Sequence, residues 1–212
     1  MGAKVDEKAQ LGTTGAAKVP RTARGERTLR RILDAAREEF GARGFAESSI
    51  VGITQRAGVA LGTFYTYFES KEALFQALVR DMSAQVRDTV GPILAEGKGG
   101  LDSERRALAA FLRFAREHRD IYRIIDESEF VQPAVYREHY ETTATRIAAR
   151  LRAGRDKGEI GSSFSDDELD ILAWGMMGAN VFLGLRFAVW GKEDSDKVAD
   201  TMNRVWRKGF SQ

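Results

Sequence analysis

Apolar residues return every three or four positions through most of this 212-residue chain, and this helical period constrains the fold more than any other feature. The clearest case places five apolar residues on one face of a helix: Leu29, Ile32, Leu33, Ala36 and Phe40. The sequence has no sustained apolar–polar alternation and no Asn-Gly or Asp-Gly turn, so it predicts no strand or hairpin. The pattern therefore predicts an all-α protein.

Start and stop signals divide the chain into expected helices. Gly44 is expected to end the first helix, Ser49 to cap a short second one, and Gly58 to end it. Ser70 caps a long fourth helix, and the three prolines are expected to start or end helices. The other expected helices cover residues 60–67, 71–91, 102–117, 119–127, 133–157, 165–190 and 195 onward, the 165–190 helix opening with a Ser165–Glu168 capping box.

Composition excludes several kinds of chemistry. The chain has no cysteine and two histidines, which excludes disulfides, cysteine nucleophiles and zinc fingers. His118 and His139 stand on separate expected helices, and we find no catalytic constellation, so we expect no catalytic residue, metal or cofactor. No segment reaches the ~20 apolar residues of a membrane span, so we expect no membrane partner and a cytoplasmic location.

Positive charge gathers near the N-terminus. Residues 1–20 show no period and are expected to form a flexible basic tail. Residues 18–31 hold six lysines and arginines against one glutamate, although the net charge of the chain is only +2. This asymmetry suits a phosphate-binding end, whereas its plain alternative is a solvated tail.

Residues 48–75 are the most informative stretch. They predict two short helices joined by a turn at Gly58, with the small Ala57 permitting close approach, which is the pattern of a helix-turn-helix. The second of these helices would present Thr63, Tyr65 and Tyr67 outward. A helix of this size fits the major groove of DNA, which is about 12 Å wide.

This stretch resembles the DNA-binding domain of the TetR family of transcriptional regulators. The matching motifs are Arg56-Ala-Gly-Val59, Gly62-Thr-Phe-Tyr65, Tyr67-Phe68, Ser70-Lys-Glu-Ala-Leu74 and, upstream, Ile32-Leu-Asp-Ala-Ala36 with Gly44-Phe45. The resemblance covers about residues 25–80. It implies an N-terminal three-helix DNA-binding domain, residues 21–70, followed by a helical effector-binding and dimerisation domain, residues 71–212.

The resemblance implies a homodimer, most simply a repressor, that binds a near-palindromic double-stranded DNA operator and leaves it when a small molecule binds. The expected DNA contacts are Arg24, Arg27, Thr28, Ser49, Leu61, Gly62, Thr63, Tyr65, Tyr67 and Lys71. Three departures from the family pattern stand at Ala60, where a serine usually caps the helix, at Leu61, which replaces a polar residue, and at Gly52, a glycine inside the second helix. Losing such a cap costs about 1 kcal/mol.

The second half is rich in aromatic residues, which favours a small hydrophobic effector, lipid-like or aromatic. The candidate effector residues are Phe111, Phe114, Tyr122, Ile125, Phe130, Tyr136, Tyr140, Trp174, Met177 and Asn180. For any one aromatic residue, a plain core role is the simpler reading. Helix 165–190 is apolar on two sides, so we expect the homodimer to form through the last two long helices.

Two alternatives stay open at this stage. The chain could be an all-helical small-molecule-binding protein or enzyme in which the helix-turn-helix is only structural. It could also be an architectural protein that binds any duplex with a steep salt dependence.

Overall fold

A computed structural model describes residues 20–96 and 100–210, and within these ranges every regular element is a helix. The prediction of an all-α fold is therefore confirmed, whereas the predicted flexible tail, residues 1–20, lies outside the described residues except for its last residue. The elements are α1 (Ala23–Glu47), α2 (Ile50–Ala57), α3 (Leu61–Tyr67), α4 (Lys71–Ala95), α5 (Gly100–Glu117), α6 (Asp120–Val131), α7 (Pro133–Asp156), α8 (Asp166–Leu183), the π-helix η1 (Gly184–Val189) and α9 (Ser195–Phe210).

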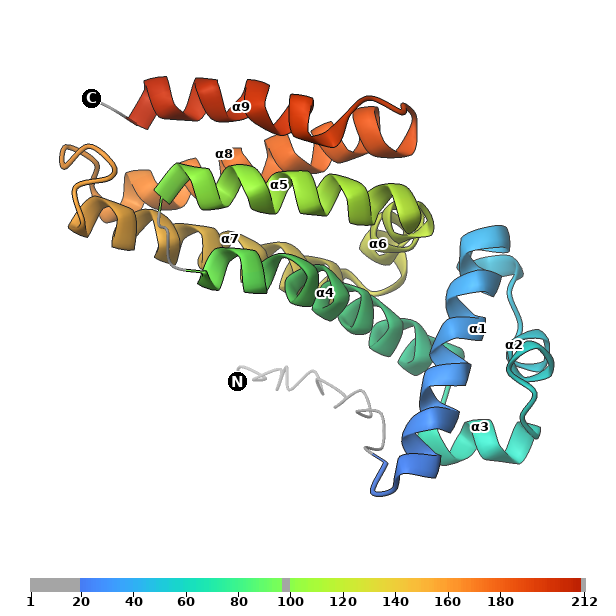
Figure 1. Cartoon of the computed structure of the whole chain (residues 1–212). Coiled ribbons are helices and arrows are strands. Elements are labelled where there is room, and N and C mark those ends of the chain that lie inside the picture. Colours follow the sequence, from blue (N-terminus) through green and yellow to red (C-terminus); the bar gives the residue numbers. More distant parts are fainter. Residues whose placement is uncertain (1–19, 97–99, 211–212) are drawn as a thin grey trace, which may run out of the picture.

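The molecule has two parts of different shape (Figure 1). The head consists of α1, α2 and α3, and α1 crosses one end of the remaining helices. The bundle consists of α4 to α9, whose long helices run side by side. The first turns of α4 pack against the head, and α6 lies at the end of the bundle that faces α1.

The expected caps confirm how the short helices are delimited. Ser49 and Ser70 accept hydrogen bonds from the backbone N–H groups of Gly52 and Ala73, and Ser165 forms the predicted capping box. Gly58 ends α2 in the left-handed region, with φ 62° and ψ 42°, where a side chain is disfavoured. Ala60 offers no side-chain cap to α3, as the sequence predicted.

Several helix boundaries differ from the sequence prediction. Helix α1 continues past its expected end at Gly44, where φ is 81° and ψ is 170°, to Glu47, and α6 continues to Val131 instead of residue 127. Helix α4 does not end at Gly91-Pro92 but continues to Ala95 with Pro92 inside it. A proline one turn from a helix end removes a single backbone hydrogen bond, and apolar residues such as Leu94 still pack in this last turn. The helix predicted over 165–190 changes to a π-helix at Gly184, a change of hydrogen bonding that the apolar period does not reveal.

The hydrophobic core runs across the boundary predicted at residue 70. Phe40 and Phe64 of the head belong to the same buried cluster as Phe75 of α4, Phe114 of α5 and Ile124 of α6. Two smaller clusters hold the bundle together, one between α7 and α8 and one between α5 and α9. The head is therefore packed firmly onto α4 and α6 rather than tethered by a linker.

Helix α8 buries only one of its faces. Leu169, Ala173 and Met176 are buried, whereas Ile171 and Phe182 on the other side are each 71% exposed. The segment Asp166–Val189 is long and apolar enough to cross a membrane by length and composition, although only 28% of its most apolar window is buried. The bundle therefore leaves a broad apolar face that no other described part of the chain covers.

Candidate DNA-binding surface and effector cavity

Helix α3 is held by its inner residues and exposed on its outer side. Phe64 is fully buried and Phe68 nearly so, which anchors the helix on α1 and α4. On the outer side Leu61 is 45% exposed and Tyr65 is 52% exposed, and Gly62 between them is also open to solvent. A seven-residue helix is about 10 Å long, so this exposed side can enter the major groove of DNA.

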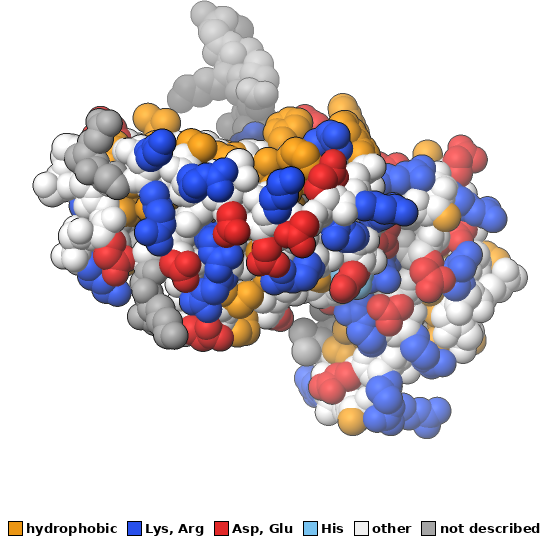
Figure 2. Space-filling view, turned by 45° about the horizontal axis from the view of Figure 1, so that its top comes forward, with side chains coloured by type: hydrophobic (Ala, Val, Ile, Leu, Met, Phe, Trp, Pro, Cys, Tyr) orange, Lys and Arg blue, Asp and Glu red, His pale blue; other side chains and the backbone are white. Residues whose placement is uncertain are grey.

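The start of α1 carries a cluster of positive charge. Arg24, Arg27 and Thr28, which sequence analysis selected, line one shallow hollow together with Arg30 and Arg31, which it did not. Within residues 20–96 and 100–210, the guanidinium groups of Arg24, Arg27 and Arg31 form no ion pair, whereas Arg30 pairs with Asp34 and Asp81. Figure 2 shows this gathering of lysine and arginine at the lower right end of the molecule.

Two of the expected DNA contacts turn inward. The hydroxyl of Tyr67 donates to the carbonyl of Gly25 at 3.2 Å, because the last turn of α3 faces the start of α1. The ammonium of Lys71 donates to the carbonyls of Phe45 and Ser48 at 2.8 and 2.9 Å. The Phe45 carbonyl also accepts from the backbone N–H of Ser48, so Lys71 adds a second donor at the end of α1 and positions the α1–α2 turn instead of reaching outward.

Thr63 and Ser49 are neither fully exposed like Tyr65 nor turned inward like Tyr67 and Lys71. Thr63 is half-buried on α3, and Ser49 is exposed but already accepts the hydrogen bond that caps α2. The outward surface of the head therefore consists of Leu61, Gly62 and Tyr65, with Thr63 at its edge and the α1 arginines beside it.

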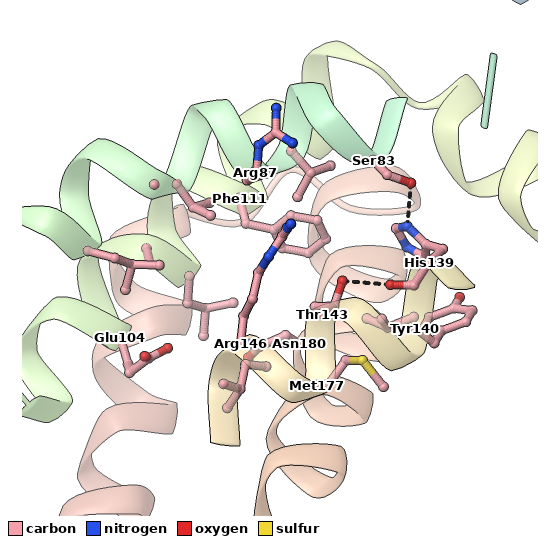
Figure 3. A pocket seen from close by; sticks show the side chains of 18 of the residues that line it. Ser83, Arg87, Glu104, Phe111, His139, Tyr140, Thr143, Arg146, Met177 and Asn180 are labelled. Atoms are coloured by element: carbon pink, nitrogen blue, oxygen red, sulfur yellow. Dashed lines mark hydrogen bonds between the residues drawn. The ribbon is translucent and has the colours of Figure 1, made fainter. Parts of the chain in front are cut away.

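A cavity of about 500 Å³ lies inside the bundle, between α4, α5, α6, α7 and α8 (Figure 3). Small-molecule sites in proteins span about 300–1,000 Å³ and are mostly apolar, as this one is. It extends along α4 from Ser83 to Ala95, which corresponds to about 18 Å at the rise of a helix. The cavity is therefore long enough for an extended ligand.

The cavity brings together six of the ten residues selected from the sequence for effector binding. These six are Phe111, Tyr122, Ile125, Tyr140, Met177 and Asn180.

The other four do not line the cavity, which corrects the sequence prediction. Phe114 is buried in the core shared with the head, and Tyr136 packs beside that core with its ring against Tyr140. Phe130 points to solvent from the last turn of α6 and is 83% exposed, and Trp174 lies on the outer face of α8. Apolar spacing identifies these residues as helical, but it does not tell which of several neighbours each side chain meets.

Polar groups at the head-facing end of the cavity are paired within the protein. The Ser83 hydroxyl lies 2.7 Å from Nδ1 of His139, and Thr143 donates to the His139 carbonyl at 2.8 Å (Figure 3). Burial lowers the pKa of His139 from 6.5 to about 4, so its imidazole is neutral near pH 7. Tyr122 donates to the carbonyl of Val181 at 3.0 Å, and burial raises the pKa of this phenol.

The mouth of the cavity opens between α4 and α7. The lining residues that are exposed to solvent are Arg87 and Ala95 on α4, Arg146 and Ala149 on α7, and Asp126 on α6. Neither of these arginines was selected from the sequence. The sequence spacing could have identified Arg146, since Thr143, Arg146, Ile147 and Arg150 share the helical face of α7 that holds Tyr140.

Helix α6 connects the cavity to the head. Tyr122 and Ile125 line the cavity from one side of this helix. From the other side, Arg123 donates to the carbonyl of Gly41 at 2.9 Å, and a Glu127 carboxylate oxygen accepts from the backbone N–H of Phe45 at 2.7 Å. One short helix therefore contacts both the cavity and the C-terminal end of α1.

Comparison with known proteins agrees with this architecture. Residues 32–78 match the family model of bacterial regulatory proteins, tetR family. The HTH-type transcriptional regulator UidR of Escherichia coli is 31% identical over 137 residues, which cover 63% of this chain and 69% of UidR. The uncharacterized HTH-type transcriptional regulator YdgC of Bacillus subtilis is 28% identical over 180 residues, which cover 83% of this chain and 89% of YdgC.

A solved structure shows the same fold over most of the chain. The transcriptional regulator FadR from Bacillus subtilis, in complex with stearoyl-CoA, superposes with a TM-score of 0.69 at 19% identity and covers 85% of this chain and 98% of its own. The match spans the head and the bundle together. The chain belongs to the TetR family of bacterial transcriptional regulators, which bind DNA through a helix-turn-helix and are not enzymes.

Proposed function

We propose that this regulator is a homodimer, most simply a repressor, that leaves a near-palindromic operator when a hydrophobic small molecule fills the bundle cavity. The observation that carries the proposal is the double contact of α6, which lines the cavity with Tyr122 and holds the head with Arg123 and Glu127. We further propose the cytoplasm as its compartment, because its DNA ligand is found there.

The proposed DNA contacts follow from exposure and charge. Leu61, Gly62, Thr63 and Tyr65 would meet base edges in the major groove, where apolar side chains contact thymine methyl groups. Arg24, Arg27 and Thr28 would contact phosphates beside that groove, since their side chains lie in one positively charged hollow.

The proposed dimer forms through α8 and α9. The exposed large apolar residues on this part of the bundle are Ile171, Trp174, Phe182, Trp190 and Val205. A Cβ atom added at Gly175 or Gly178 would meet no atom of residues 20–96 and 100–210 within 4 Å, so a second helix has room to approach closely there. In Figure 2 interspersed charges cover the face in view and hydrophobic side chains gather along its upper edge. An apolar face of this kind supports a two-fold contact.

Effector release requires that the ligand bind one arrangement of the two heads better than the other. A ligand that displaces Tyr122 or Ile125 would move α6, and α6 is bonded to the end of α1 through Arg123 and Glu127. The spacing of the heads decides DNA binding, because a dimer reads half-sites about 34–36 Å apart. The stearoyl-CoA bound to the similar FadR structure supports a ligand with a hydrophobic chain.

A gel-shift assay with DNA flanking its own gene tests the proposal. The wild-type protein should prefer one fragment over unrelated duplex at physiological salt, and Tyr65→Ala should weaken that complex by roughly tenfold or more. Arg137→Ala, an exposed change on α7, is the control and should bind like wild type. Equal affinity for every duplex would instead favour an architectural protein, and no DNA binding would favour a small-molecule-binding bundle.

A further inference from the structure

The charged groups along the cavity mouth differ in whether they have partners. Arg87 pairs with its neighbour Asp88 at 2.8 Å, and Arg150 pairs with Glu104. Within residues 20–96 and 100–210, the guanidinium of Arg146 forms no ion pair and donates no hydrogen bond, and in Figure 3 its side chain extends into the space next to Phe111. The hydrogen bond from Arg87 and, to a smaller extent, the charge of Arg146 lower the pKa of the Asp88 carboxyl, although the side chains of Arg146 and Asp88 form no ion pair. An arginine beside apolar walls that forms no ion pair is an anchor for an anion.

The charged residues around the cavity indicate which end of a ligand would lie at the mouth. Arg87 and Arg146 stand on opposite sides of the mouth, on α4 and α7. Asp126 lies towards the α6 end, where a negative ligand group would be repelled. The walls running from the mouth to that end are apolar and include Val86, Phe111, Ile121 and Ile125. A ligand that satisfies both regions is negatively charged at one end and carries a long apolar chain.

From this arrangement we infer that the effector is an anionic amphiphile, a long-chain acyl compound whose head group binds Arg146 and Arg87 at the mouth while its chain extends towards α6. The inference rests on the proposed function for its site and adds the charge, orientation and chemical class of the ligand. Two sources share this chemistry, a free fatty acid and an acyl-CoA.

The test compares ligands that share one sixteen-carbon chain and differ in their head groups. Full-length protein is titrated by calorimetry, below micelle-forming concentrations, with hexadecanoate, hexadecanoyl-CoA, hexadecanol and hexadecylamine, and with CoA alone. At least one of the two anionic ligands should bind roughly tenfold more tightly than hexadecanol and hexadecylamine. The comparison of hexadecanoate with hexadecanoyl-CoA identifies the source of the head group.

Variants of α7 connect that preference to Arg146. Arg146→Gln should reduce the affinity for the preferred anion by roughly tenfold and leave hexadecanol binding unchanged, and Arg146→Lys should keep part of the preference. Arg137→Gln, exposed on the same helix but outside the cavity, is the matched control. The inference is overturned if hexadecanol or hexadecylamine binds as tightly as both anions, or if Arg146→Gln and Arg137→Gln behave alike.

A gel shift with the same ligands separates this inference from the proposed function. If an anion binds through Arg146 and the operator complex stays intact, the ligand class holds and ligand-controlled DNA release is wrong. If the operator is released equally by hexadecanol, ligand-controlled release holds and the anionic class is wrong.

Discussion

The head and the bundle differ in how completely their interiors are filled by side chains. In the head, Phe40 and Phe64 fill a core together with Phe75 of α4, and each of these rings is fully buried. In the bundle, a cavity of about 500 Å³ stays open between five helices, and Phe182 at the end of α8 and Trp190 just after η1 face solvent. The head is complete within one chain, whereas the bundle leaves room inside and an apolar face outside.

This difference shows where the chain depends on other molecules. Unfilled volume and exposed apolar surface both lower the stability of an isolated protomer, because their atoms lack packing partners. A ligand in the cavity and a second copy on α8 would each supply such partners and stabilise the folded state by mass action. The head needs DNA for its function but does not need DNA to complete its core.

The largest expected effect comes from truncating matched phenylalanines in the two regions. Phe64→Ala removes a fully buried ring and should lower the free energy of unfolding by about 3–5 kcal/mol. Phe111→Ala removes a ring that already borders empty space and should cost about 1–2 kcal/mol. Urea unfolding followed by circular dichroism measures both. Equal losses would contradict the contrast between a filled head and an open bundle.

A pH titration probes the titratable group in the cavity wall. The folded pKa of His139, about 4, lies below its ordinary value of 6.5, so the unfolded chain binds more protons between these values. The stability from neutral His139 is therefore complete above pH 6.5 and is lost as pH falls towards 4, by up to about 3 kcal/mol.

His139→Gln should remove that part of the pH dependence, measured as the difference in unfolding free energy between pH 7 and pH 4.5. His118→Gln, on α5's C-terminal side and outside this cavity, is the control. Parallel pH profiles for wild type and His139→Gln would show that His139 does not carry this loss.

A smaller effect is expected from charging the outer face of α8. Phe182→Glu should weaken self-association by at least roughly tenfold, because a carboxylate would lie in the apolar contact proposed for the dimer. Phe130→Glu is a matched control, since Phe130 is 83% exposed but lies on α6, away from that face. Sedimentation velocity over a dilution series measures both. Unchanged assembly of Phe182→Glu would place the contact elsewhere.

The smallest expected effect on stability concerns the missing side-chain cap of α3 in the head. Ala60 stands at the N-cap of α3 and offers no side-chain acceptor, so Ala60→Ser should stabilise the protein by about 1 kcal/mol. Thermal unfolding should show a higher midpoint for this variant than for Ala46→Ser, a control at an exposed position outside any N-cap. A midpoint no higher than the control would mean that water already satisfies this helix end.

The same contrast explains what could be predicted from the sequence. The head is built from local signals, so Ser49, Gly58 and Ser70 predicted its boundaries, and helical spacing predicted that Phe64 is buried and Tyr65 exposed. The inward turn of Lys71 was not predictable, because it depends on carbonyls more than twenty positions earlier in the chain.

The cavity depends on contacts between helices that are distant in sequence. Helical spacing identified Tyr122 and Met177 as inward residues but could not separate them from Phe114, which faces a different neighbour. Arg146 went unnoticed because an arginine on an amphipathic helix is normally solvated. Its proposed importance comes from Arg87 across the mouth and from the absence of any ion pair at Arg146 within the described residues.

The two-sided arrangement of α6 has a consequence for how such regulators diversify. The side chains proposed to select a ligand, such as Arg146 and Phe111, belong to other helices, while Arg123 and Glu127 hold the head from the opposite face of α6. Substitutions around the cavity mouth can thus change which ligand binds without altering the contacts between α6 and the head. Related regulators could keep the contacts between α6 and the head and still respond to different small molecules through substitutions in the cavity lining.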